Sequence, residues 1–200
     1  MSSSDSISRR DVLRTLAMGA VGGSVLQLIP LAAAEHVHRM VKQEKAQAAA
    51  GAYSPKFFPS HQYQTLRSLC DAIIPADEKS GGAIQAGAPE FIDLLTSENK
   101  EYQLDLGGGL MWLDGFCSDR FGNPYLSCTA EQKTQVLDLI AYRKNAESDP
   151  SISQGVEFFA FLRKLTTDGF YSSEIGIADL EYIGNTFVRD FPGCPPVPET

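Results

Sequence analysis

Three histidines and two groups of carboxylates are the side chains of this 200-residue chain that could transfer protons or bind a metal ion. His36 and His38 are two positions apart and so face different ways on a helix, whereas metal ligands on one helical face are spaced by four. We expect both to be solvated, and His61 to lie at the surface. The carboxylates lack EF-hand spacing and fit helix caps and solvated faces better than proton-transfer or calcium sites; they are Asp71, Asp77, Glu78, Asp168, Glu174, Asp179 and Glu181. We therefore predict no catalytic residue and no metal site.

Glycine and serine form no cofactor or nucleophile motif. The chain has no G-x-G-x-x-G after a strand and no G-x-S-x-G elbow, and the cluster at residues 107–109 lacks the βαβ context of a dinucleotide site. The formal net charge of -8 argues against nucleic acid and anionic lipid as partners, because both require clustered Lys and Arg. We predict no cofactor bound by this chain and no nucleic-acid partner.

The four cysteines lack the C-x-x-C spacing of zinc ribbons and redox motifs. Cys117 and Cys128 flank a Gly-Asn-Pro turn, which a disulfide between them could staple. The alternative is that they are buried free thiols, which pack as small hydrophobic groups.

The N-terminus resembles a twin-arginine export signal. Its characteristic residues are Ser8, Arg9, Arg10, Val12 and Leu13. An apolar stretch over residues 16–34 ends with Ala32 and Ala34 at an A-x-A cleavage site, and residues 48–50 are a second candidate. We predict that residues 1–34 are a signal peptide and that the chain is periplasmic; the alternative is an uncleaved membrane anchor.

The predicted export signal has a consequence for the protein that is exported. The twin-arginine route exports proteins that are already folded, usually because they hold a cofactor. Since the body of the chain lacks a cofactor motif, we expect the cofactor to belong to a partner that travels with it. The twin-arginine translocase is itself an expected partner.

Apolar residues recur with helical spacing in several stretches. The expected helices cover residues 60–75, 89–95, 98–118, 129–140 and 158–169. A capping box at 129–132 begins one of them, and Ser97 is the expected cap of another. We predict a compact all-α fold of about five to six helices with irregular loops and an extended Pro-rich tail.

The remaining segments are expected to be less regular. Residues 35–54 have no apolar stripe and suit a solvated helical linker, leaving 55–200 as the domain. Residues 76–87 and 145–153 are expected loops. Three glycines at 107–109 predict a kink, a break or a close approach within their helix.

Aromatic side chains are the candidates for contact with another chain. The run that includes Phe158 and Phe159 is wider than one amphipathic stripe, so it fits either a central core helix or a helix covered in part by a partner. The full set of interface candidates is Phe57, Phe58, Phe158, Phe159, Tyr171 and Cys194.

Over roughly residues 55–196 the chain resembles the gluconate 2-dehydrogenase subunit 3 family. Gly81 stands where the family often has proline, a mild departure within a loop. The matching motifs are Asp71-Ala-Ile-Ile-Pro75-Ala-Asp77, Gly82-Ala83, Gly87-Ala-Pro-Glu-Phe-Ile-Asp93, Phe158-Phe159, Leu162-Arg163, Leu165-Thr166, Gly169-Phe-Tyr-Ser172, Tyr182-Ile-Gly-Asn185 and Gly193-Cys-Pro195.

The resemblance implies a non-catalytic small subunit of a periplasmic or membrane-associated sugar dehydrogenase. The implied catalytic partner is an FAD-dependent enzyme of the glucose–methanol–choline type, exported as a passenger, and electrons commonly pass on to a cytochrome c. The resemblance assigns no catalytic residue to this chain. The alternatives are a stand-alone periplasmic helical enzyme and a membrane-anchor protein.

Overall fold

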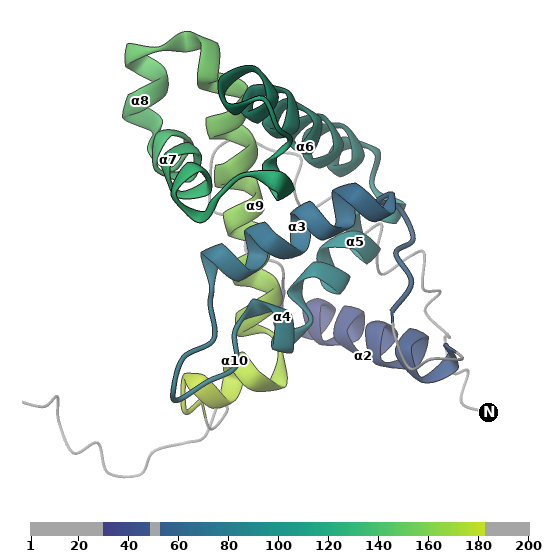
Figure 1. The fold of residues 1–200 in the computed structure, drawn as a ribbon. Helices are drawn as coiled ribbons and strands as arrows, with labels where there is room; N and C mark the ends of the chain where they lie inside the picture. Colours follow the sequence, from purple (N-terminus) through teal and green to yellow (C-terminus); the bar gives the residue numbers. More distant parts are fainter. Residues whose placement is uncertain (1–29, 49–52, 183–200) are drawn as a thin grey trace, which may run out of the picture.

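The computed structural model describes residues 30–48 and 53–182, and every regular element within them is a helix (Figure 1). The all-α prediction is confirmed. Residues 76–82 form the expected loop, but α4 occupies part of the remainder; α8 and η2 occupy most of residues 145–153, so the loop expected there is wrong. The α-helices are α2 (Leu31–Gln47), α3 (Ser60–Ile73), α4 (Ala83–Ala86), α5 (Ala88–Glu98), α6 (Lys100–Phe121), α7 (Ala130–Ile140), α8 (Arg143–Ser148), α9 (Ser153–Tyr171) and α10 (Glu174–Asp179), with 3₁₀ turns η1 (Tyr125–Ser127) and η2 (Pro150–Ile152).

Helix boundaries follow local chemistry. The capping box at the start of α7 is confirmed, since the Thr129 hydroxyl accepts from the Gln132 N–H and the Gln132 side chain accepts from the Thr129 N–H. The predicted cap at Ser97 is wrong, because α5 continues through that residue to Glu98. Asn99 caps α6 instead, with its side-chain oxygen accepting from two backbone N–H groups of the first turn.

Helix α9 lies at the centre of the fold and packs against α5 and α6 most extensively, with α3, α4, α7, α8 and α10 also in contact (Figure 1). Helices α3, α5, α6, α7 and α9 contribute buried apolar side chains to a common core. Fully buried members are Leu66, Leu69, Phe91, Ile92, Leu106, Leu110, Leu113, Leu162 and Leu165. Burial of each such side chain contributes about 1.5–3 kcal/mol relative to leaving it in water.

Helix α2 belongs to the packed domain. The expectation of a solvated linker is wrong here, because Val37 and Val41 are buried with Ala34 and Met40 and the helix packs on α5. Its exposed side is rich in Lys, Glu and Gln, which obscures a stripe made of short apolar side chains. Ala32 is exposed and Ala34 is buried in the first turns of this helix, while signal cleavage there remains a prediction.

The buried Asp93 of α5 holds the segment that precedes α3, residues 53–58. One carboxylate oxygen accepts from the Tyr53 hydroxyl at 2.8 Å and the Lys56 N–H at 2.6 Å; the other accepts from the Phe57 and Phe58 N–H groups. Burial raises the pKa of the Tyr53 hydroxyl, and the adjacent carboxylate raises it further, so Tyr53 remains a donor. Asp93 therefore fixes the position of both phenylalanines.

Candidate partner-binding surface

The three histidines have separate surroundings and do not share one site. His38 is not solvated as expected: its ring stacks on Phe91 with centroids 5.0 Å apart, and its Nε2 lies 3.1 Å from the Ser172 hydroxyl. Burial lowers the pKa of His38, which favours the neutral ring. The Nε2 atom of His36 is buried without a hydrogen-bond partner. Within residues 30–48 and 53–182, no three His, Cys, Asp or Glu side chains gather as a metal site.

The carboxylates of the two sequence clusters are structural or solvated. One Asp77 oxygen accepts from the backbone N–H groups of Lys79 and Ser80, each at 2.8 Å. Asp168 accepts from Lys164 at 2.9 Å, and Glu174 pairs with Lys42 at the surface. The remaining members are exposed: Asp71, Glu78, Asp179 and Glu181. Their arrangement is that of turn caps and ion pairs.

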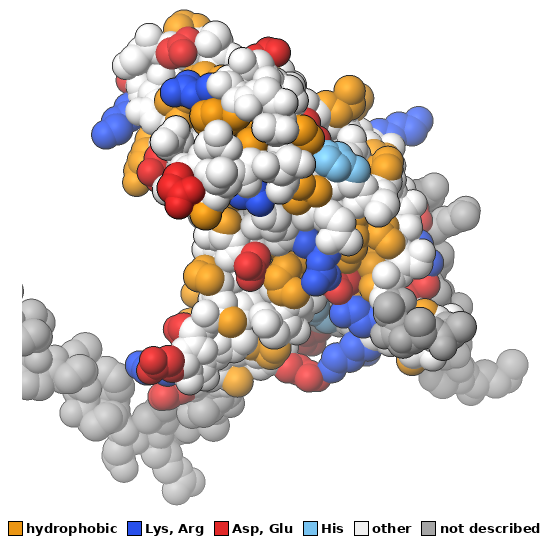
Figure 2. All heavy atoms as spheres, viewed as in Figure 1, with side chains coloured by type: hydrophobic (Ala, Val, Ile, Leu, Met, Phe, Trp, Pro, Cys, Tyr) orange, Lys and Arg blue, Asp and Glu red, His pale blue; other side chains and the backbone are white. Residues whose placement is uncertain are grey.

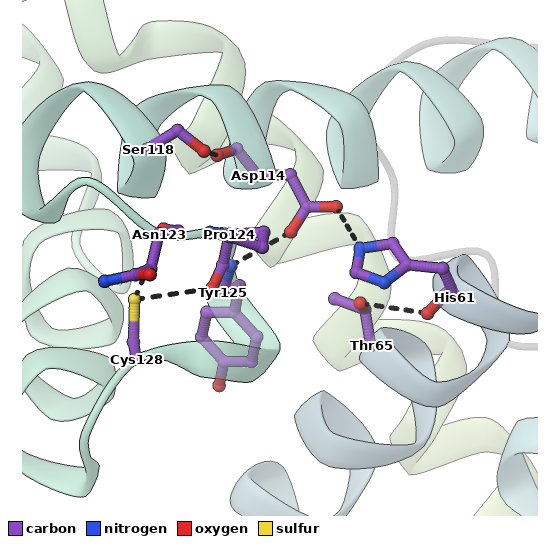
Figure 3. A network of polar contacts seen from close by, with 8 residues as sticks. All are labelled: His61, Thr65, Asp114, Ser118, Asn123, Pro124, Tyr125 and Cys128. Carbon is purple, nitrogen blue, oxygen red and sulfur yellow. Dashed lines mark hydrogen bonds and ion pairs between the residues drawn. The ribbon is translucent and has the colours of Figure 1, made fainter.

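A polar network joins the start of α3 to the C-terminal half of α6 (Figure 3). One Asp114 oxygen lies 2.7 Å from His61 Nε2, and the other accepts from the Tyr125 N–H at 3.0 Å. A His–Asp pair can serve in acid–base catalysis when the ring also contacts a nucleophile. In the part of the chain that the structure describes, no hydroxyl or thiol hydrogen-bonds to the His61 ring, so the pair ties η1 and α3 to α6.

The cysteines Cys117 and Cys128 are neighbours, as the disulfide prediction requires. Both are buried free thiols close enough to interact electrostatically, and Cys128 Sγ lies 3.6 Å from the carbonyl oxygens of Asn123 and Pro124. Burial, reinforced by the second thiol, raises the pKa of Cys117 to about 12. The disulfide stays a prediction, and Cys194 lies outside the described residues.

The glycines of α6 do not break it, so that alternative is wrong. The helix is continuous from Lys100 to Phe121 and ends at Gly122, which adopts the left-handed conformation with φ of 77°. The close neighbour of Gly109 is a side chain and not a backbone, since a Cβ there would overlap the Phe158 ring of α9. The reciprocal contact places Trp112 of α6 against Gly155 of α9. Two glycine–aromatic contacts therefore bring α6 and α9 together.

Most of the phenylalanines predicted to contact a partner are instead buried within this chain. Phe58, Phe158 and Phe159 are buried in the core, which leaves little of their surface for a partner. Phe57 is half-buried beside α6, and Tyr171 is 40% exposed at the end of α9.

A different apolar surface lies on α6 and was missed from the sequence. Leu104 and Met111 have 75% and 67% of their surfaces exposed, the highest values among large hydrophobic residues in the described ranges. Gly108 and Gly115 alternate with them at spacings of i, i+4, i+7 and i+11, which places all four on one helical face. We call these four residues the α6 face. Hydrophobic atoms project from the surface over α6 in the space-filling view (Figure 2).

Packing among the described residues does not require the two glycines of the α6 face. Within residues 30–48 and 53–182, a Cβ at Gly115 would have no atom within 4 Å, and one at Gly108 would meet only the Gln154 side chain at 3.9 Å. Glycine inside a helix costs about 1 kcal/mol relative to alanine. The chain therefore keeps two destabilising residues beside two exposed apolar ones.

Charged groups border the α6 face. Glu101, Asp105 and Asp119 are exposed on the same helix, on the side that Trp112 occupies. On the opposite side lie the half-buried Phe57 near Gly107 and the His61–Asp114 pair. An exposed apolar strip rimmed by polar and charged residues is an arrangement found in protein interfaces.

Comparison with known proteins identifies the family. The family described as gluconate 2-dehydrogenase subunit 3 matches residues 60–193, which is more than half of the chain. No curated protein and no solved structure shows a significant match. The matched range covers α3 through α10 and therefore includes the α6 face. The chain belongs to the gluconate 2-dehydrogenase subunit 3 family.

Proposed function

We propose that this chain is the non-catalytic small subunit of a periplasmic sugar or glycoside dehydrogenase. Its partner is an FAD-dependent catalytic subunit of the glucose–methanol–choline type, and a cytochrome c is a further partner of the complex. The family match over residues 60–193 carries the proposal, because the family description names one subunit of a dehydrogenase. The exposed apolar α6 face supports it, since such surfaces mark protein contacts.

The second part of the proposal is an export role. The Arg9–Arg10 pattern provides the address of a folded cargo, and the body of the sequence has no dinucleotide-binding motif that would require folding before export. A catalytic subunit that folds around FAD in the cytoplasm explains why the exported protein must be folded before it crosses the membrane. The small subunit then carries it to the periplasm and supports its folding and stability.

Co-purification tests the subunit role. A C-terminally tagged chain is expressed in its native host, recovered from the periplasm, and examined by flavin absorbance, mass spectrometry and sugar-dependent dye reduction. We expect a flavoprotein dehydrogenase in a fixed ratio to the tagged chain. Recovery of a colourless chain without a dehydrogenase would contradict the proposal.

Paired arginine variants test the export role. With Arg9→Lys and Arg10→Lys together, we expect both subunits to accumulate in the cytoplasm. Arg14→Lys is the matched control, because it makes the same change outside the paired position. Periplasmic dehydrogenase activity should fall in the double variant and persist in the control; equal activity in both would rule out carriage by this signal.

The mature N-terminus distinguishes the subunit from a membrane anchor. No helix in the described ranges is both long and apolar enough to cross a bilayer. We expect N-terminal sequencing of the periplasmic chain to begin near Glu35, which leaves most of α2 packed on α5. An intact N-terminus recovered in the membrane fraction would favour the anchor.

A further inference from the structure

We propose that the α6 face is the docking site for the catalytic subunit, and that the outward glycines allow a helix of that subunit to pack unusually close. This inference rests on the proposed function and names the surface that performs it. It does not depend on the buried phenylalanines that the sequence suggested.

The first support is the contrast between glycines on one helix. Gly109 is explained by the Phe158 ring, which occupies the space of its missing side chain. Gly108 and Gly115 have no such occupant among the described residues, since added Cβ atoms would reach open space or ordinary contact distance there. A backbone from another chain is an occupant that only glycine admits at short distance.

The second support is the apolar surface beside those glycines. Leu104 and Met111 project from the same face, so a partner that packs into the glycine positions also covers both side chains. The face extends over the 12 residues from Leu104 to Gly115, a rise of about 16 Å at 1.5 Å per residue. That length accommodates about three turns of a crossing helix, as part of a larger interface.

The charged residues that border the α6 face indicate which kind of partner binds there. The acidic border made by Glu101, Asp105 and Asp119 favours a partner helix with a small-residue apolar stripe flanked by Lys or Arg. A second copy of this chain carries the same net charge of -8, so self-association through this face is opposed by repulsion between the copies. The structure thus favours a different chain with a basic border over a homodimer.

The test uses the full chain co-expressed with the dehydrogenase subunit that co-purifies with the tagged wild type. Leu104→Ser combined with Met111→Ser should reduce the co-purified flavin per chain at least tenfold. Tyr142→Ser combined with Leu180→Ser is the matched control, because these side chains are 56% and 58% exposed on other helices or turns. The control should retain the wild-type flavin ratio.

Glycine substitutions separate docking from folding. Gly108→Ala combined with Gly115→Ala should raise the Tm of the free chain by ~2–4 °C per substitution, because alanine favours the helix. The same variant should weaken association with the catalytic subunit at least tenfold. A merely structural effect would move stability and association in the same direction, so opposite changes support the inference.

The outcomes distinguish this inference from the proposed function. If the wild type retains the dehydrogenase and both α6 variants retain it equally, the docking site is elsewhere and the inference is overturned. If the wild type chain runs as a dimer that Leu104→Ser with Met111→Ser converts to a monomer, the occupant is a second copy and the inference is also overturned. If the wild type retains no dehydrogenase, the proposed function itself fails.

Discussion

Gly109 and Gly115 lie on the same helix, and a methyl group would have opposite effects at the two positions. At Gly109 it would overlap the Phe158 ring, whereas at Gly115 it would have no neighbour within 4 Å. The inner glycine is required by the packing of this chain and the outer glycine is not. The difference shows that the role of a helical glycine depends on what fills the space of its missing side chain.

The largest expected effect is at Asp93, which positions the segment beside the outer side of α6. Asp93→Ala removes the acceptor for one hydroxyl and three backbone N–H groups, of which the Phe58 N–H is buried and the others are part-buried. We expect the free energy of unfolding to fall by about 4 kcal/mol, measured by urea denaturation. Tyr53→Phe should cost about 1 kcal/mol, because it removes one donor only. A similar small loss for both variants would contradict the anchoring role of Asp93.

The next largest effect on the free energy of unfolding is expected on the side of α6 that packs against α9. Gly109→Ala forces the Phe158 ring to move and should destabilise the chain by about 3 kcal/mol, whereas Gly115→Ala should stabilise it by about 1 kcal/mol. Thermal unfolding of the two variants measures the difference. A double-mutant cycle of Gly109→Ala with Phe158→Leu should show coupling, since the smaller side chain makes room. Equal Tm values for the two alanine variants would remove the distinction between inner and outer glycines.

Oxidation of the cysteine pair to a disulfide should stabilise the packing on the buried side of α6 and leave its exposed side unchanged. A disulfide between Cys117 and Cys128 closes a short loop and should stabilise the chain by about 2–3 kcal/mol. We expect it in periplasmic protein, detected as resistance to alkylation until a reductant is added under denaturing conditions. In the reduced folded chain the raised pKa of Cys117, about 12, predicts slow alkylation at pH 8. Two alkylated thiols in denatured, unreduced periplasmic protein would contradict the disulfide.

The smallest effect is expected for the His61–Asp114 pair at the edge of the α6 face. His61 has half of its side chain exposed, so His61→Ala should cost about 0.2–1 kcal/mol. Asp114→Ala should cost more, because it also removes the acceptor of the Tyr125 N–H. Dehydrogenase turnover in the complex should be unchanged by His61→Ala, measured at saturating sugar. A large loss of turnover with retained complex would point to catalysis by this pair.

Periodicity predicts the strongly amphipathic helices, and capping chemistry predicts the start of α7 to the residue. Composition predicts a helix at α2 but not its burial, because short Ala and Val side chains form the buried stripe among many polar residues. The sequence does not predict α8, a helix without buried residues and therefore without an apolar stripe to detect.

The candidate site was less predictable than the fold. The apolar spacing over residues 98–118 predicts the helix and its buried Leu106 and Leu110, but it assigns no role to Leu104 and Met111, which the structure leaves exposed. Asp93 stands in a family motif, but its partners precede it by 35 to 40 residues and only the fold brings them together. The glycine cluster marks a tightly packed position, but the sequence does not identify the Phe158 ring as the neighbour of Gly109.

Site-specific photo-crosslinking tests the docking claim most directly. A photoreactive amino acid is placed at position 111 on α6 and, in a separate chain, at position 142 beyond the end of α7, and each chain is irradiated in cells that express the complex. We predict a crosslink from position 111 to the flavin-dependent catalytic subunit and none from position 142. A crosslink to that subunit from position 142 alone, or from position 111 to a second copy of this chain, would contradict the assignment of the α6 face.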